Sequence, residues 1–119
     1  MKVIIAGSRD FDDYELMKKS LKGMTFITEV VNGGARGADT LGGQFGIDNG
    51  MVVKLFPAQW EKYGKKAGHI RNTQMAEYAD MLIAFWDGMS KGTAHMIKEA
   101  KKRNLEVLVI NYKLHEWDW

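Results

Sequence analysis

The residues best suited to bind a ligand lie in a glycine-rich turn, VVNGGARGAD, over residues 30–39. An apolar run breaks there into Gly33, Gly34 and Gly37, a residue type that tolerates positive φ and lets another molecule approach the main chain. A helix starting after the turn directs unpaired N–H groups and its positive dipole end at an anion, and Arg36 adds guanidinium donors. The turn predicts a phosphate or other anion site, while the alternative is a tight turn that caps a helix without a ligand.

Two further turns carry the same residue types. GSR at residues 7–9 follows the first apolar run, and DGMSKGT at 87–93 follows a later one. If these runs are strands of one parallel sheet, all three turns lie at the carboxyl edge of that sheet, where ligands bind in open α/β folds. This concentration of glycine favours a ligand site over turns that only connect elements.

Several other sites are not supported by the sequence. The chain has no GxxxxGK[ST] segment, and its glycines miss the spacing of the dinucleotide fingerprint. His69, His95 and His115 share no close ligand spacing, so we expect no metal and no cofactor. Trp60 and Trp86 offer aromatic faces for a base, although Trp86 closes an apolar strand and is equally suited to the core.

Composition limits the classes of protein that need to be considered. With 119 residues we expect one domain over residues 1–119, and hydrophobic residues at 45% favour a globular chain. The net charge is +2, so nucleic acid is possible as a partner but not favoured. Cysteine is absent and no apolar run is long enough for a membrane span, from which we expect a cytoplasmic protein without membrane contact.

The elements that position the turns alternate along the chain. Apolar runs predict strands over 2–7, 26–31, 51–56, 80–86 and 106–112, and helical spacing predicts helices over 12–22, 38–49, 67–78 and 89–104. The stretch 57–66 reads as the longest irregular loop, and a tail carries Trp117 and Trp119. The glycines within 38–49 predict a helix packed very close to the sheet or to another helix.

This alternation predicts the α/β class, with a five-stranded parallel sheet between two layers of helices in a Rossmann-like three-layer sandwich. The common order for such elements is 3-2-1-4-5, which makes the first and fourth strands neighbours at the topological switch point. The ligand crevice is then expected beyond the carboxyl ends of those two strands.

Four motifs resemble the YspA and YpsA-related branch of the SLOG superfamily: AGSRDF, NGGARGAD, FPAQWEKYGKKAGHIRNTQMAEYAD and FWDGMSKGT. The likeness covers nearly the whole chain and agrees in order and spacing. It implies a Rossmann-like fold and binding of a nucleotide or nucleotide derivative.

Two other SLOG branches leave alternatives open. The LOG phosphoribohydrolases cleave the N-glycosidic bond of nucleoside monophosphates with an arginine and a PGGxGTxxE motif. The resemblance sets Arg71 in the arginine position and Gly88, Gly92 and Thr93 in the phosphate loop, but Met96 stands at the glutamate position. The DNA-processing protein A group binds single-stranded DNA and resembles the chain through GSR and GARGAD.

The favoured interpretation is a protein that senses or sequesters a nucleoside phosphate or an ADP-ribose-like ligand. If the chain is instead a hydrolase, Arg71, Asp39 and Asp87 are the catalytic candidates. The predicted ligand-binding residues come from the three turns, the 57–66 loop and the following helix: Gly7, Ser8, Arg9, Gly33, Gly34, Ala35, Arg36, Gly37, Asp39, Trp60, Arg71, Asn72, Asp87, Gly88, Ser90, Gly92 and Thr93.

The sequence also predicts self-association. The terminal tryptophans and the glycine-rich helix would expose apolar or closely approachable surface that a small monomer covers poorly. We therefore expect a homodimer or a larger homo-oligomer, as the family resemblance also implies.

Overall fold

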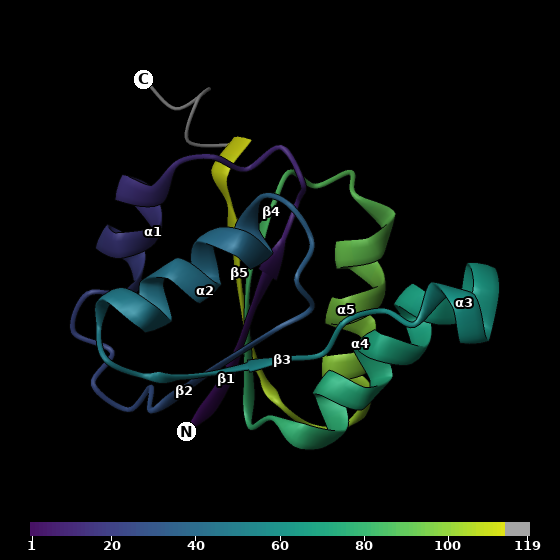
Figure 1. Ribbon diagram of the computed structural model, residues 1–119. Coiled ribbons are helices and arrows are strands. Elements are labelled where there is room, and N and C mark those ends of the chain that lie inside the picture. The colour runs from purple at the N-terminus through teal and green to yellow at the C-terminus, as the bar shows by residue number, and fades with distance from the viewer. Residues whose placement is uncertain (114–119) are drawn as a thin grey trace.

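Short apolar runs form a five-stranded parallel sheet in the computed structural model, which describes residues 1–113. The strands are β1 (Lys2–Gly7), β2 (Glu29–Asn32), β3 (Val52–Leu55), β4 (Met81–Trp86) and β5 (Glu106–Asn111). They lie in the order β3-β2-β1-β4-β5, which confirms the predicted fold class and order (Figure 1). β1 and β4 are therefore neighbours, with Gly7 opposite Phe85 at their carboxyl ends.

Helices cover both faces of the sheet (Figure 1). They are α1 (Tyr14–Leu21), α2 (Ala38–Asp48), α3 (Trp60–Tyr63), the 3-10 turn η1 (Gly64–Lys66), α4 (Ala67–Tyr78) and α5 (Lys91–Lys102). α1 and α2 lie on one face, and α4 and α5 lie on the other (Figure 1). The Rossmann-like three-layer arrangement follows from this distribution.

Alternating side chains of the central strands build a core on each side of the sheet. Val3 and Ile5 of β1 pack with Phe45 of α2 on one face, and Ile4 packs with Met96 of α5 on the other. Strands buried on both faces read as continuous apolar runs, which is why the sequence predicted β1 and β4 well.

The glycines of α2 allow this helix to lie directly on the sheet, as predicted. A Cβ placed on Gly42 would be 2.6 Å from the Ile5 Cγ2 atom, and one on Gly46 would be 2.7 Å from the Val53 Cγ2 atom. Both distances are shorter than a carbon–carbon contact allows, so these positions require glycine. The close packing fixes the start of α2, and with it Asp39, beneath the carboxyl edge of β1.

Two predicted segments differ from the structure by more than two residues or in their type of secondary structure. β2 begins at Glu29 rather than residue 26, because residues 24–28 form a turn in which the Ile27 N–H donates to the Met24 carbonyl at 3.2 Å. The prediction of an irregular loop over 57–66 is wrong for residues 60–66, which form α3 and η1. Two N–H groups of this segment, from Lys62 and Tyr63, donate to the Gln59 carbonyl.

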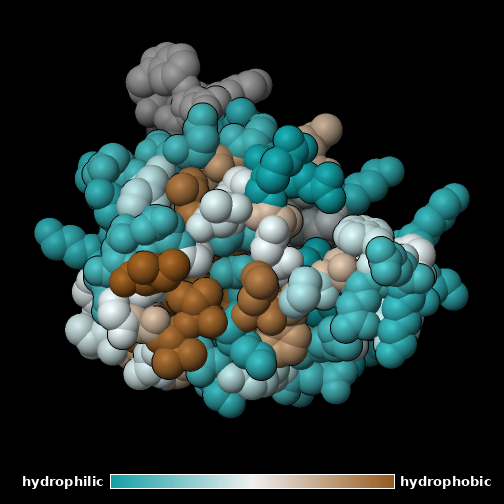
Figure 2. Space-filling model, in the orientation of Figure 1, coloured by the Kyte–Doolittle hydropathy of each residue, from teal (hydrophilic) through white to brown (hydrophobic). Residues whose placement is uncertain are grey.

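Apolar residues are exposed on the sheet edge formed by β3 and on the end of α2. Ile47, Val52 and Leu55 are exposed there, and Figure 2 shows hydrophobic residues gathered over α2 and β3. The homo-oligomer stays a prediction, and Trp117 and Trp119 lie outside the described residues. Across residues 1–113, no helix combines the length and apolar character that crossing a membrane requires.

Candidate functional site

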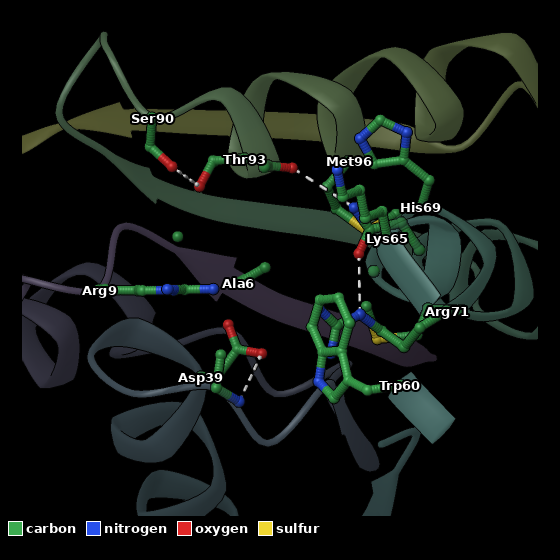
Figure 3. Close-up of a pocket in the computed structure, with 16 residues that line it drawn as sticks. Ala6, Arg9, Asp39, Trp60, Lys65, His69, Arg71, Ser90, Thr93 and Met96 are labelled. Atoms are coloured by element: carbon green, nitrogen blue, oxygen red, sulfur yellow. Dashed lines mark hydrogen bonds between the residues drawn. The ribbon is translucent and has the colours of Figure 1, made fainter. Parts of the chain in front are cut away.

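A cavity of about 240 Å³ opens at the switch point between β1 and β4, beyond their carboxyl ends (Figure 3). We call it the central cavity. Its walls come from the end of β1, the turn after β2, the α3–α4 segment and the start of α5. The lining residues are Ala6, Gly7, Arg9, Ala35, Asp39, Trp60, Lys65, Gly68, His69, Arg71, Asn72, Met75, Ser90, Gly92, Thr93 and Met96.

A second hollow of about 380 Å³ adjoins the central cavity, and we call it the outer hollow. It shares Arg9, Ala35, Trp60 and Arg71 with the central cavity. Its remaining lining is the glycine turn with Arg36 and an apolar wall: Gly33, Gly34, Arg36, Leu55, Pro57 and Ala58. The two spaces together offer a polar floor beside an apolar rim, the arrangement that small-molecule sites commonly show.

Positively charged side chains predominate around the central cavity. Arg9, Lys65 and Arg71 contribute cations, whereas Asp39 is the acidic residue among those that line it. Figure 3 shows Arg9 reaching into the space between Asp39 and the pair formed by Ser90 and Thr93. This balance favours an anionic ligand.

The Asp39 carboxylate is buried and bonded to the glycine turn. Its Oδ2 atom accepts hydrogen bonds from the N–H groups of Gly33 at 3.0 Å and Ala35 at 3.4 Å. Burial raises the pKa of Asp39 to about 6, although the Gly33 N–H and the nearby Arg71 charge act in the opposite direction. Two donors of the turn are thus already satisfied by an anion that belongs to the chain itself.

The glycines of this turn allow parts of the protein to approach one another. A Cβ on Gly33 would lie 2.1 Å from the Arg71 Nη1 atom. Gly37 has φ +77°, and a Cβ there would lie 2.3 Å from the Ser8 carbonyl oxygen. The sequence had predicted that these glycines admit a ligand, but their closest neighbours are other segments of the same chain.

Arg71 lies between the central cavity and the outer hollow. Its Nη1 donates to the Gly33 carbonyl at 2.8 Å, and its Nε donates to the Asn72 Oδ1 atom at 3.0 Å. Burial lowers the pKa of Arg71, Asp39 opposes this shift and Arg9 adds to it. A guanidinium carries five N–H donors, of which these bonds use two, and Arg71 lines both spaces.

The start of α5 provides a second set of donors. Ser90 is the N-cap residue, and no side chain of the described residues caps the N–H groups of this first turn. The Ser90 Oγ and Thr93 Oγ1 atoms lie 3.2 Å apart, and a Cβ on Gly92 would meet nothing within 4 Å. Because unpaired N–H groups and the helix dipole both favour negative charge, this turn is suited to a phosphate.

Three predicted site residues lie outside the central cavity and shape the turn after β4. Ser8 is buried, and its hydroxyl accepts the Asp87 N–H at 3.1 Å. The Asp87 Oδ1 atom accepts the N–H groups of Met89 and Ser90, both at 2.8 Å. Partial burial raises the pKa of Asp87, but these N–H donors outweigh it and hold the pKa below its usual value. Gly88 sits in the same turn with φ +84°.

The structure also adds residues that the sequence did not single out for the site. Lys65 of η1 and His69 of α4 line the central cavity, and the sulfur-containing side chains of Met75 and Met96 form part of its buried floor. Spacing was the available signal, since His69 and Asn72 are three residues apart on one helix and share a face. Trp60, 55% exposed, borders both spaces.

Two comparisons with known proteins identify relatives of the chain. The model of the YspA, cpYpsA-related SLOG family matches residues 1–63. The chain is 37% identical over 117 residues to the gene 61 protein of Mycobacterium phage D29, covering 90% of this chain and 94% of that protein. No solved structure matches the chain significantly.

The chain therefore belongs to the YspA, cpYpsA-related SLOG family. Membership in this family suggests a nucleotide-related role. The name of the phage relative states no activity, so the ligand has to be argued from the site itself.

The raised pKa of Asp39 predicts a specific dependence of stability on pH. Between the unfolded value of 3.8 and the folded value of about 6, the native state holds a proton that the unfolded state releases. The stabilisation that Asp39 contributes to the folded state is therefore fully present below pH 3.8, and it is lost as the pH rises through about 6. Removing the ionisation with Asp39→Asn should abolish this loss, which amounts to roughly 3 kcal/mol.

Urea unfolding of both proteins at a series of pH values measures the effect. The free energy of unfolding of the wild type should fall, relative to Asp39→Asn, across this pH interval. Parallel curves for the two proteins would show that Asp39 ionises normally and that its burial has no energetic consequence.

Proposed function

We propose that the chain binds a nucleotide or nucleotide derivative, such as a nucleoside phosphate or an ADP-ribose-like ligand, and so senses or sequesters it. The observation that carries this proposal is the convergence of the uncapped α5 start with Arg9, Lys65 and Arg71 on one cavity. Family membership supports the same class of ligand.

In this proposal the phosphate lies at the start of α5. Gly92 leaves open space there, and the hydroxyls of Ser90 and Thr93 lie beside the uncapped N–H groups. Arg71 approaches from α4 and supplies charge-assisted hydrogen bonds. The start of α2 is less suited to this role, because Gly37 lies against the Ser8 carbonyl and the Ala38 N–H already donates to that carbonyl.

The remaining parts of the ligand fit the other walls. Trp60 offers an exposed ring at the rim of both spaces, on which a base can stack. Asp39 lines the central cavity, where a carboxylate oxygen can accept from a ribose hydroxyl. The apolar wall of Leu55, Pro57 and Ala58 extends the base site into the outer hollow.

A glycosidic hydrolase is the second candidate, and the raised pKa of Asp39 favours it. A carboxyl group with a pKa of about 6 can exchange a proton near neutral pH. The opposing observation is Met96, which lines the cavity at the position of the LOG-type glutamate and offers neither charge nor proton. We therefore favour binding without bond cleavage.

Binding variants test the first candidate. Arg71→Ala should weaken the affinity for AMP or ADP-ribose by about 10-fold or more, because it removes charge-assisted hydrogen bonds. Gly92→Val should abolish binding, since its branched side chain fills the space beside the α5 start, whereas Gly92→Ala, with its smaller side chain, should retain more affinity. Titration calorimetry measures all three.

Lys101→Ala is the matched control for Arg71→Ala, because it removes a cation from the far end of α5. It should bind like the wild type. Wild-type affinity in a folded Gly92→Val variant would contradict the proposed phosphate position.

Release of free base from a panel of nucleoside monophosphates, ADP-ribose and NAD separates the two candidates. The wild type should show slow or no release, since losing one well-placed acid or charge commonly costs about 100-fold or more in rate. Met96→Glu should introduce activity if the other groups are in place, and Met96→Gln is the control without an acid. Efficient wild-type turnover that disappears in Asp39→Asn would establish the hydrolase instead.

A further inference from the structure

A buried amide connects Arg71 to the start of α5. Asn72 is 6% exposed, and its Oδ1 atom accepts the Arg71 Nε–H at 3.0 Å. Its Nδ2 atom donates to the Gly92 carbonyl at 3.4 Å and lies 3.1 Å from the His95 Nδ1 atom. One side chain of α4 thereby contacts both groups assigned to the phosphate and an imidazole of α5.

The bonding pattern fixes the proton on His95. An amide nitrogen only donates, so the His95 Nδ1 atom has to accept and carries no hydrogen. The proton of the neutral ring is then on Nε2, which lies 3.6 Å from the Glu99 Oε1 atom. The ring is held as a hydrogen-bond acceptor toward Asn72.

The surroundings of His95 favour its neutral form. Burial lowers the pKa of His95, and the His69 ring of α4, stacked on it at 3.8 Å, and Lys98 act in the same direction. Glu99 opposes them, but its carboxylate also lies 3.8 Å from the Arg103 guanidinium.

We propose that Asn72 and His95 are positioning residues: the His95 acceptor fixes the Asn72 amide, and the amide aims Arg71 and the Gly92 turn at the phosphate. The inference rests on the proposed function, because it assigns Arg71 to an anionic ligand. A rotated amide would point its NH₂ at the Arg71 Nε–H and its oxygen at the Gly92 carbonyl, and both contacts would be repulsive.

His95 adds a third contact to the amide orientation that Arg71 and Gly92 already favour. While its Nδ1 atom accepts, all three contacts of Asn72 are satisfied together. Without that acceptor the amide loses one of these three partners, and the restraint that it transmits to Arg71 is weaker. The pair therefore preorganises a guanidinium that lies on another residue, which lowers the cost of binding.

Three variants test this inference with AMP as the probe. His95→Leu removes the acceptor while keeping an apolar side chain, and His95→Asn restores an acceptor oxygen near the place of Nδ1. Calorimetry should show affinity about 10-fold weaker for His95→Leu and for Asn72→Leu, with His95→Asn within about 3-fold of the wild type. Equal affinity in His95→Leu and the wild type, or equal losses in His95→Leu and His95→Asn, would overturn the inference.

Nuclear magnetic resonance provides a readout that does not depend on any ligand. The ¹⁵N shifts of His95 should report a neutral ring protonated at Nε2, and the Arg71 Nε–H should exchange slowly in the wild type and rapidly in Asn72→Leu. A ring protonated at Nδ1, or unchanged Arg71 exchange, would refute the positioning role. Absence of AMP binding with these signals intact would contradict the proposed function instead.

Discussion

The site depends on two opposite charges that hold the main chain of Gly33 from both sides. The buried Asp39 carboxylate accepts the Gly33 N–H, and the Arg71 guanidinium donates to the Gly33 carbonyl. A buried carboxylate is costly unless it is bonded and compensated, and these contacts offset part of that cost, while the raised pKa of Asp39 reflects the remainder. The turn after β2 is thereby fixed against α4, which makes one wall of the central cavity.

The two helix starts at the edge of the sheet differ in the space around them. Each preceding turn has a carboxylate bonded to two of its N–H groups, Asp39 before α2 and Asp87 before α5. The start of α2 lies against the Ser8 carbonyl, whereas a Cβ on Gly92 at the start of α5 would meet nothing within 4 Å. Arg71 contributes to both regions, because its charge lies near the Asp39 carboxylate and its side chain lines the central cavity, which the start of α5 completes. In the proposed function, the anion therefore takes its donors from the start of α5 and from the Arg71 guanidinium.

The sequence predicted the sheet order because buried parallel strands are continuous apolar runs and the connections leave few topologies. The sequence also indicated that the turn needs its glycines, but not which group each of them accommodates. That Gly33 makes room for Arg71, 38 residues away, depends on how α4 packs against the turn. Lys65 was missed for the same reason, whereas His69 could have been found from its spacing to Asn72 on one helix face.

The central claim is that the cavity between β1 and β4 takes a nucleotide-like anion. Native mass spectrometry of the gently purified protein, before and after incubation with nucleoside phosphates and ADP-ribose, tests it most directly. The account predicts a stoichiometric mass increase equal to one such molecule per chain, lost when Gly92 is replaced by Val. A spectrum with only the bare chain in both samples would contradict it.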